Sequence, residues 1–578
     1  MEQKRKVIGF MLEELESKFS TELVRDVVNA IPKDENIELV VLAGKYMNNA
    51  VHEKTRDYKM VYNTIYKLSN TCHFDGFLIH LGSIEGADLE KLKKEYYAGI
   101  DEIPKVFVTY NSEAQTTVNY DNESGIREAV NCLVNVNGLT HFCMLGGRDD
   151  NSDARKRRDI FISALKENGI SFSRWNYEKT DMSELTVTEA ERLLDNNPGV
   201  QAIFCVNDAV AKGLYEAMNK RSLVAGKDIM VFGFDNTHMA GEMMPTLSSI
   251  GADSCSLGQR SLEVLLAKMN GSEIKSALVP TRLYGRESLN YEMYDYTMIE
   301  MQFAQKSFIY RIFDDCFYRY RSEIIARESV DLKRLFLEFM SRILNAVKLS
   351  YMSYEEFDEV SALIAKFFEK GAMNYTDATK FIRSIERLQA AINSLHRSPA
   401  VMIMVNRLCS QMRSESLCSI SEKMCLNTDR SIANRRKMQD FMIHSMLADT
   451  SGTAKEETFL RTLDCIGIAN AALYLYEEPV IFEQNKSLSI PKHIRLKCIM
   501  RAGELYVIPE ERQKGTVDEL FLRDELPVKC KGYAALNIFY GNNIYGILLC
   551  ELTDEIYNRG DYIALQLGQA IHVARRDN

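Results

Sequence analysis

The feature that most constrains the fold is an alternation, in residues 1–290, between short apolar runs and longer amphipathic stretches. The runs are continuous apolar segments rich in Val, Ile, Leu and Phe, which is typical of strands buried on both faces of a parallel sheet. The stretches between them carry apolar residues at helical spacing. Repeated strand–helix units predict an α/β fold of doubly wound parallel sheets. The apolar runs are 7–10, 39–42, 76–79, 106–108, 142–145, 202–205 and 229–232.

The rest of the chain predicts two further regions. Residues 291–450 contain one glycine and one proline and carry apolar residues at helical spacing, which predicts an all-helical connector. A long signalling helix and a plain bundle are both open, and the absence of strict heptads favours the bundle. Residues 451–578 return to β-rich runs, with a hairpin turn at 541–543 and a closing helix at about 558–574. This pattern predicts an α+β domain.

Composition excludes several classes of function. The net charge of −10 gives the chain no global attraction for nucleic acid or anionic lipid. No apolar run reaches the roughly 18 residues of a membrane span, and no secretory signal is visible. The 13 cysteines are scattered without a C-x-x-C pair, which fits a reducing cytoplasm and offers no metal site. No nucleophile–base pair or phosphate-binding glycine loop is present, so we expect neither an enzyme nor a cofactor.

Six motifs follow one another in the second half of residues 1–290. They have the patterns D-N-x-x-G, R-x-x-(I)-F, P-x-x-x-A-I-F-x-x-N-D, V-x-G-F-D-N, P-x-L-x-x-I and R-x-S, at 121–125, 157–161, 198–208, 231–236, 245–250 and 286–288. This ordered set resembles the ligand-sensing domain of lac/galactose-repressor-type transcription regulators, which has the periplasmic-binding-protein-like type I fold. The main departure within these motifs is Ile160, where the family has a glycine.

The resemblance implies two lobes joined by three crossing strands, with a ligand held between the lobes. Residues 1–290 are the expected sensing domain. The crossings are expected near Asn119, Ile250 and Lys275. Lobe 1 is then about 5–118 and 251–273, and lobe 2 about 119–249 and 275–288. The helix-turn-helix of this family has no room before the first strand, so direct DNA binding is not expected.

Four residues are the candidate ligand-binding residues: His80, Arg157, Asn207 and Asp235. Asn207 and Asp235 directly follow apolar strand runs, and ligands of parallel α/β sheets bind beyond the carboxyl ends of strands. An arginine with carboxylate and amide groups holds a polar molecule through directional hydrogen bonds. The resemblance singles out Arg157 as the ligand arginine and places a polar contact at His80.

Each candidate also has a structural interpretation. Asp208, beside Asn207, is the expected cap of a helix starting at Ala209. Asp235 is compatible with a role in the turn alone, Arg157 with a solvated surface, and His80 with an incidental position. Sugar-binding members of the family stack an aromatic ring on the sugar. The aligned positions here hold non-aromatic residues and the chain's only tryptophan lies several residues away, so the site is either selective for another ligand or degenerate. The residues concerned are Met182, Ser254 and Trp175.

The C-terminal region resembles the GAF-like module of bacterial multidomain sensors, through residues 466–477 and 543–551. We therefore expect a cytoplasmic sensor that binds a sugar-like or nucleoside-like ligand and relays lobe closure through helices. A homodimer, a downstream signalling partner and no membrane association are also expected. Two alternatives stay open. One is a lac-repressor-type transcription regulator that acts on DNA directly or through a partner, and the other is the truncated sensory part of a diguanylate cyclase or kinase.

Overall fold

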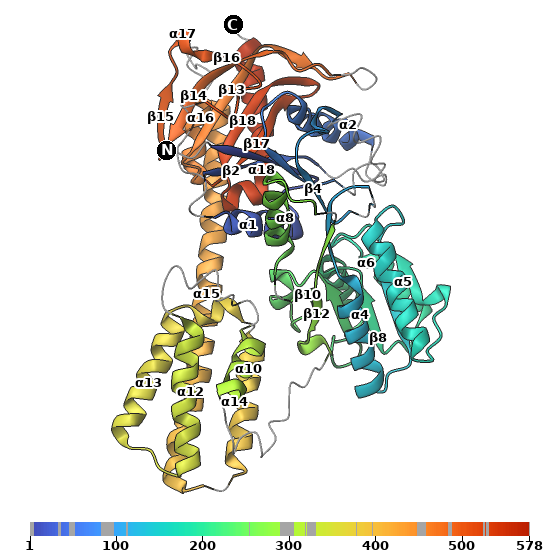
Figure 1. Cartoon of the computed structure of the whole chain (residues 1–578), viewed down its shortest axis with the longest axis vertical. Coiled ribbons are helices and arrows are strands. Elements are labelled where there is room, and N and C mark those ends of the chain that lie inside the picture. The colour runs from blue at the N-terminus through green and yellow to red at the C-terminus, as the bar shows by residue number, and fades with distance from the viewer. Residues whose placement is uncertain are drawn as a thin grey trace.

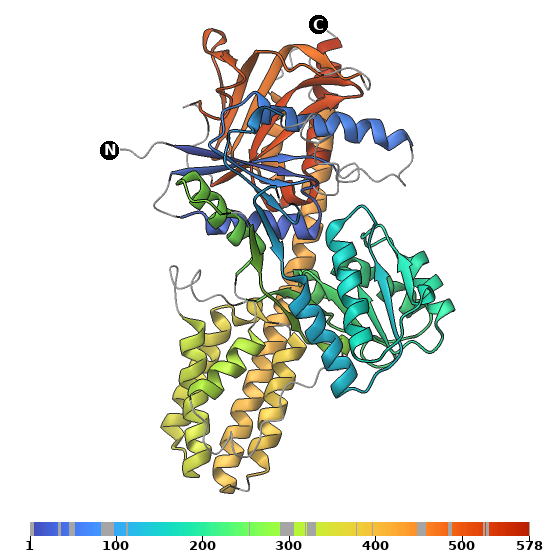
Figure 2. The ribbon, with the colours of Figure 1, turned by 45° about the vertical axis from the view of Figure 1, so that its right-hand side comes forward.

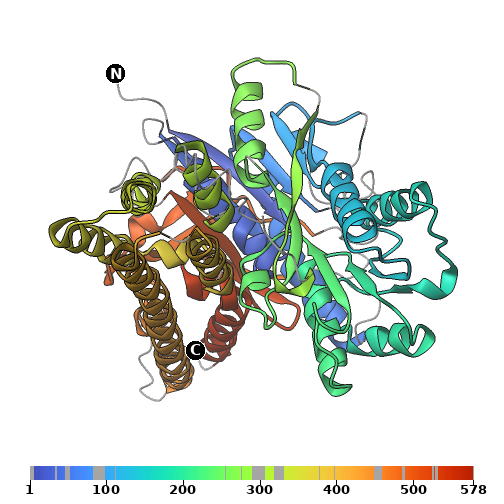
Figure 3. The same ribbon diagram turned by 90° about the horizontal axis from the view of Figure 1, so that it is seen from below.

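The computed structural model shows an upper sheet-containing body, a second α/β lobe and a helical bundle (Figure 1). Figure 3 shows the bundle and the second lobe side by side, seen from below. Within the described residues, no helix is long and apolar enough to cross a lipid bilayer. The structure describes residues 5–32, 36–45, 53–81, 98–110, 112, 114–253, 255–274, 276–289, 306–317, 320, 331–376, 378–395, 397–447, 458–483, 488–523, 526 and 531–576.

The first lobe is a parallel sheet flanked by helices. Its five strands in residues 1–120 pair in the order β5-β4-β3-β1-β2, and β11 adds to the outer edge beside β5. Helix α1 begins at the cap Ser17, whose side chain accepts a hydrogen bond from the Ser20 amide, and it packs against α8. The elements are β1 Lys6–Leu12, α1 Lys18–Ala30, β2 Ile37–Ala43, α2 Glu53–Asn63, η1 Thr64–Asn70, β3 Gly76–His80, η3 Ala98–Ile100, β4 Lys105–Val108, β5 Thr117–Tyr120, α8 Leu257–Met269 and β11 Ser276–Val279.

The second lobe is a six-stranded sheet in the order β12-β10-β9-β8-β6-β7, parallel except for the β10–β12 pair. Its cyan helices and strands lie at the right of Figure 2. The elements are α4 Asn122–Asn131, η4 Cys132–Val136, β6 Phe142–Gly146, α5 Ser152–Glu167, η5 Arg174–Asn176, β7 Tyr177–Lys179, α6 Val187–Asn196, β8 Ala202–Cys205, α7 Asp208–Lys220, β9 Met230–Phe234, η6 His238–Gly241, β10 Ser248–Ala252, β12 Thr281–Tyr284 and η7 Glu287–Leu289.

The chain passes between the lobes three times, but each passage lies a few residues later than the sequence predicts. The crossings are at Asp121, Asp253 and Pro280, because β5 and β11 belong to the first sheet and β10 to the second. Residues 276–279 are therefore part of lobe 1 and not of lobe 2. The sequence placed the third crossing in the turn after α8. In the structure the chain first adds β11 to the sheet of lobe 1 and then crosses to lobe 2.

The described part of residues 306–447 consists of helices joined by short turns. Helices α12, α13 and α14 pack against the lower part of α15, and α10 packs against α12 and α14, around one aromatic-rich core. Helix α15 then continues upward out of the bundle (Figure 1). The lower end of α15 contributes Val405 and Met412 to the bundle core, and its upper end contributes Phe441 to the core of the upper body. Both predicted alternatives are therefore present in one segment, a bundle and a long helix. The helices are α10 Lys306–Cys316, α12 Leu332–Leu349, α13 Tyr354–Glu369, η8 Ala372–Tyr375, α14 Ala378–Asn393 and α15 Pro399–Leu447.

The C-terminal region is built onto the edge of the first lobe. Strand β17 pairs in parallel with β2, in the register Tyr533 to Val40, so one sheet of twelve strands runs through both regions. This differs from the predicted separate domain at 451–578. The hairpin at 541–543 joins β17 to β18 as expected. The elements are α16 Thr458–Arg461, η9 Thr462–Ile466, β13 Ala471–Ile481, β14 His493–Arg501, β15 Glu504–Val507, α17 Glu510–Gln513, β16 Lys514–Thr516, β17 Gly532–Tyr540, β18 Asn543–Glu551 and α18 Asp554–Arg576.

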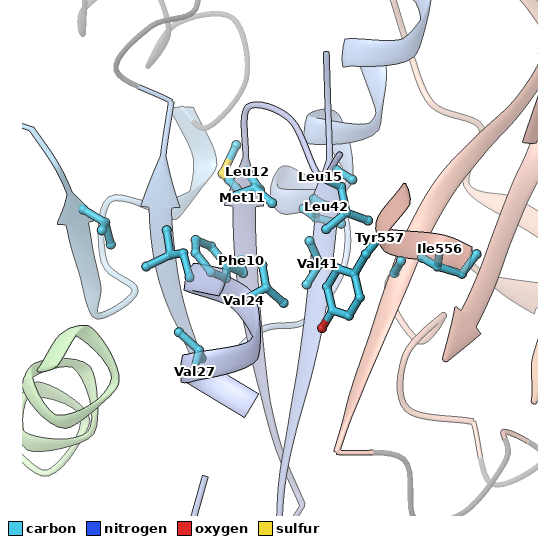
Figure 4. Close-up of a cluster of buried hydrophobic side chains, with 14 of the residues drawn as sticks. Phe10, Met11, Leu12, Leu15, Val24, Val27, Val41, Leu42, Ile556 and Tyr557 are labelled. Carbon is cyan, nitrogen blue, oxygen red and sulfur yellow. The ribbon is translucent and has the colours of Figure 1, made fainter. Parts of the chain in front are cut away.

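Apolar packing reinforces this join. Figure 4 shows side chains of β1, β2 and α1 beside Ile556 and Tyr557 of α18 in one cluster. The buried Asn537 of β17 also donates hydrogen bonds to the Tyr62 carbonyl (3.1 Å) and the Thr64 hydroxyl (2.8 Å). A side-chain amide buried without partners is costly, so these bonds fix the position of η1 against β17. The first lobe and the C-terminal region thus share one hydrophobic core.

Candidate functional site

A cavity of about 90 Å³ lies between the two lobes. Helix α1 of the first lobe forms one wall, and the turn after β9 of the second lobe forms the opposite wall. Tyr120, the last residue of β5, and Leu257, the first of α8, also line it. The cavity is thus placed beyond the carboxyl ends of β5 and β9, where parallel α/β sheets bind ligands.

Arg157 is buried at this cleft and is not a solvated surface residue. It is 4% exposed, and its guanidinium lies 3.5 Å from the centroid of the Phe234 ring. Its Nε donates to Asn122 Oδ1 (3.1 Å), one Nη donates to the Val206 carbonyl (2.8 Å), and the other donates to Asp235 Oδ1 (3.2 Å). These bonds use all three nitrogens of the guanidinium. Arg157 therefore joins Asn122 and Val206 to Asp235, which lies in the cavity wall.

Asp235 is the predicted site residue that lines the cavity. It follows β9 in a turn with a φ of +94°, and Asn236 after it has a φ of +47°. Both lie in the left-handed region, where Asp and Asn are more tolerated than other non-glycine residues. Burial raises the pKa of Asp235 above its usual range, and Arg157 opposes that shift. The turn geometry therefore places Asp235 in the cavity wall, where Arg157 bonds to its carboxylate.

Asp208 does not cap α7, which corrects the sequence interpretation. The cap is Asn207, and the Asp208 carboxylate accepts hydrogen bonds from the Thr237 amide (2.8 Å) and the Ser249 hydroxyl (2.5 Å). The glycine of the V-x-G-F-D-N motif makes room for it, since a Cβ on Gly233 would lie 2.4 Å from Asp208 Oδ1. Asp208 thus shapes the turn that carries Asp235.

The side-chain amide of Asn207 forms hydrogen bonds within the second lobe through both its oxygen and its nitrogen. Its Oδ1 accepts from the Val210 amide (2.9 Å), and its Nδ2 donates to the Met182 carbonyl (3.0 Å). It does not line the cavity. Of the positions expected to carry a stacking ring, Met182 is half-buried against the core and Ser254 lies outside the described residues. Trp175 is exposed and stacks with Arg174 instead.

His80 lies across the cleft, at the end of β3. Its Nδ1 is 2.8 Å from the Thr109 hydroxyl, and its Nε2 is 3.4 Å from Glu13. Burial lowers the pKa of His80, but Glu13 and the Val108 carbonyl outweigh burial and leave the pKa above its usual value. His80 does not line the cavity, although its charge lowers the pKa of Asp235.

Sequence reasoning missed most of the cavity wall. Asn122, which bonds to Arg157, lies inside the quoted D-N-x-x-G motif, and that motif was the available signal. The wall from α1 carries no motif, because its residues look like the polar face of any amphipathic helix. The cavity residues that the sequence did not reveal include Phe19, Glu22, Asp26 and Tyr120.

The pKa of Asp208 predicts a pH dependence of stability. Burial, together with the charge of Asp235, raises the pKa of Asp208 to about 7, from 3.8 for the free group. The folded state then binds more protons than the unfolded state between those pH values, so stability falls as pH rises from about 4 to about 7, by at most about 1.4 kcal/mol per pH unit. We expect Asp208→Asn to remove this part of the slope, measured by urea unfolding at about pH 4.5 and about pH 7.5.

Asp195→Asn is the matched control, because Asp195 is an exposed carboxylate paired with Arg221 in the same lobe. It should retain the slope of the wild-type chain. Equal slopes for the wild type and Asp208→Asn would contradict the prediction.

Comparison with known proteins agrees with this geometry. Residues 134–289 match the family model of the periplasmic binding protein-like domain. The HTH-type transcriptional repressor PurR of Vibrio vulnificus is 26% identical over 227 residues, which is 39% of this chain and 64% of that protein. The ribose operon repressor of Escherichia coli is 31% identical over 134 residues, which is 23% of this chain and 40% of that protein. The chain thus spans less than two thirds of the length of these relatives.

Other matches cover a longer stretch at lower identity. Catabolite control protein A of Priestia megaterium is 22% identical over 293 residues, which is 50% of this chain and 82% of that protein. A solved lac repressor dimer bound to operator is 21% identical with a TM-score of 0.41, covering 50% of this chain and 95% of that one. The predicted resemblance to the sensor domain of lac-repressor-type regulators is confirmed by the family model and the curated relatives. These relatives are regulators, which agrees with the expectation that the chain is not an enzyme.

Proposed function

We propose that this chain is a cytoplasmic regulatory sensor that binds a small polar molecule between its two lobes. The observation that carries the proposal is the interlobe cavity. Its lining residues come from both lobes and include Asp235. In this proposal Asp235 contacts the ligand, Arg157 orients Asp235, and His80 faces the site from the first lobe. Asn207 contributes indirectly, because its side chain caps the N-terminus of α7. A ligand that touches both walls favours the closed arrangement by its higher affinity for it.

Lobe closure is proposed to reach the rest of the molecule through the helical bundle. Arg383 of α14 forms an ion pair (3.2 Å) with Glu287, at the end of the second lobe. The bundle shares α15 with the upper body, and a continuous helix transmits a displacement that a flexible linker would absorb. The second lobe contacts the bundle through Arg383 and Glu287, and α15 links the bundle to the upper body. Movement of the second lobe relative to the first therefore displaces the bundle relative to the C-terminal region. The C-terminal region is proposed to be the GAF-like output module, and the assembly a homodimer.

A transcription regulator is the second candidate, because the curated relatives are transcriptional repressors. Contacts to DNA phosphates give binding a steep dependence on salt. If the chain acts on DNA directly, the purified protein will retard duplex DNA with a salt-dependent affinity. If it acts through a partner, it will not retard DNA alone.

The sensor proposal is tested by a thermal-shift screen of the full chain with ribose, glucose, inosine, adenosine and small amines. We expect at least one compound to raise the melting temperature of the wild type and of Asp195→Asn, but to have a smaller effect on Asp235→Asn. The reason is that a charge-assisted hydrogen bond contributes about 1.5–3 kcal/mol to binding. If no compound stabilises the chain, or if Asp235→Asn responds like the wild type, the cavity is not the sensing site.

The relay is tested with the same compound by hydrogen exchange. We expect protection to change in the interlobe crossings and in α14 of the wild type, and Arg383→Ala to retain only the first change. An unchanged α14 in the wild type would mean that the cleft binds ligand without signalling through the bundle.

A further inference from the structure

One side of α15 is exposed and uncharged along the middle of the helix. At 3.6 residues per turn, eight residues between 414 and 432 share this side, which we call the α15 face, and all eight are exposed. Charged residues return to the same side beyond its two ends, at Arg407 and Arg435. Surface helices carry charged residues on their solvent side, so an exposed face without them indicates contact with a partner. The residues of the α15 face are Ser414, Leu417, Cys418, Ser421, Met424, Cys425, Thr428 and Ile432.

The bundle and the upper body both lie on the other side of α15. Met412 is buried in the core of the bundle, and Phe441 is buried in the core of the upper body. These two residues are 29 residues apart, or about eight turns, so they point to the same side of the helix. Ser421 follows Met412 by about two and a half turns and lies on the opposite side. The α15 face therefore stays exposed where the helix runs from the bundle to the upper body (Figure 1).

The spacing along the α15 face suits a second copy of the same helix. Cys418, Cys425 and Ile432 recur at intervals of seven residues, and so do Leu417 and Met424. Two helices that wind around each other stay in contact through a seven-residue repeat. When the two helices are identical and in register, each layer of one copy meets the same layer of the other. The face thus complements itself.

The length of the exposed side is also sufficient for a dimer. It continues to Ile403 in the bundle and to Ile443 in the upper body, which are both exposed. The distance between them along the helix is about 60 Å at 1.5 Å per residue. A strip about 10 Å wide on both helices then covers about 1,200 Å² in total, which is the lower end of the range for stable protein–protein interfaces.

Charges beside the α15 face specify the relative direction of the two helices. Glu415, Glu422 and Asp429 recur at intervals of seven residues along one flank of the face. The other flank carries Arg413 and Ile420, and its sequence contains no acidic residue. In an antiparallel pair each flank meets its own counterpart, so the acidic flanks would repel each other, whereas in a parallel pair each flank meets the other one. The charges therefore favour a parallel pair of identical chains.

We propose that α15 is the dimer interface of this protein and that two copies pair in parallel through the α15 face. This names the surface of the homodimer and rests on that part of the proposed function. In such a pair the two bundles lie side by side, and so do the two upper bodies. Lobe closure that displaces one bundle then reaches the α15 helices of both copies.

The interface is tested by analytical ultracentrifugation of the full chain at micromolar concentrations. We expect a dimer, and we expect Met424→Glu to raise its dissociation constant by about 10-fold or more, because this change places like charges in the centre of the interface. Leu426→Glu is the matched control. Leu426 is 57% exposed and Met424 62%, but Leu426 lies outside the α15 face, so its dissociation constant should be that of the wild type.

The direction of pairing is tested with a short bismaleimide, which links two thiols. Cys418 and Cys425 are the exposed cysteines among the described residues. In a parallel pair each of them faces its own counterpart. Cys418→Ser and Cys425→Ser should therefore each give more cross-linked dimer than the double variant. In an antiparallel pair at most one of the two cysteines can face its counterpart, so a dimer that cross-links in only one single variant, or in neither, would overturn the parallel arrangement.

The other outcomes separate this inference from the sensor proposal. A monomeric wild type would overturn the inference. If Met424→Glu is as dimeric as the wild type, or if Leu426→Glu dissociates to the same extent, the homodimer uses another surface and the inference is also overturned. Far-UV circular dichroism checks that both variants keep their helices. A compound that stabilises the wild type in the thermal-shift screen should also stabilise Met424→Glu, because Met424 does not line the cavity. A failed dimer and a failed sensing site therefore give different results.

Discussion

Arg157→Ala is expected to lower the free energy of unfolding of the second lobe by about 3–5 kcal/mol, even without ligand. Removing the guanidinium leaves the Asp235 carboxylate without its ion-pair partner in a buried position. It also leaves the Asn122 side chain and the Val206 carbonyl without their donor, and uncovers the Phe234 ring. Each loss acts in the same direction.

Urea unfolding followed by the fluorescence of Trp175 measures this effect, since Trp175 is the only tryptophan and lies in the second lobe. Lys156→Ala, an exposed change in the adjacent position of α5, should alter stability little. The double variant Arg157→Ala/Asp235→Asn should recover part of the loss, because it removes the unpaired charge. A single variant as stable as the wild type would show that Arg157 does not organise the cavity wall.

This expectation reverses what the sequence suggests. Four basic residues in a row, 155–158, look like a solvated helix face, so Arg157→Ala seems harmless to the free protein. The structure separates them, because the helix turns Arg157 inward while Arg155 and Lys156 stay exposed. Local sequence carries the helical period, but it does not say which face meets Asp235, which is 78 residues away.

The two-lobed α/β fold could be predicted because its signals are local. Buried parallel strands are continuous apolar runs, and the polar residues that follow them mark the cleft. The join between β2 and β17 could not be predicted, because edge-to-edge pairing depends on strands almost 500 residues apart that each look complete alone. Likewise, Asp235 could be inferred from its place after β9, whereas Asp26 and Tyr120 acquire their role only when the lobes meet.

One short loop contacts both His80 at the cleft and the C-terminal region where it joins the first lobe. In the loop 13–17, Glu13 contacts His80, and Glu16 reaches the C-terminal region. Helix α1, which follows this loop, faces the cavity with Asp26 and faces α18 with Arg25, whose guanidinium lies 2.6 Å from Asp554. The cleft and the C-terminal helix are therefore separated by a single helix and its leading loop.

Lys45→Met is expected to weaken this join by about 3–5 kcal/mol. The Lys45 side chain is 8% exposed, and its Nζ lies 2.8 Å from Asp561 of α18, 2.9 Å from Glu16 and 3.9 Å from Glu14. Methionine keeps most of the apolar packing but leaves three carboxylates facing one another. We expect faster hydrogen exchange in α18 and in the loop 13–17, with little change in the second lobe. Lys18→Met, an exposed change at the start of α1, is the matched control.

The loss in Lys45→Met should depend on pH in a defined direction. Burial raises the pKa of Glu16 to about 7, although Lys45 opposes the shift, so removing Lys45 raises that pKa further. A carboxyl whose folded pKa lies above its unfolded value contributes stability at low pH and loses it as pH rises through that range. The free energy of unfolding of the variant should therefore be closer to that of the wild type at about pH 5.5 than at about pH 8. A loss that is equal at both pH values, or that grows on acidification, would show that Lys45 acts through packing and not through the carboxylates that join α18 to the first lobe.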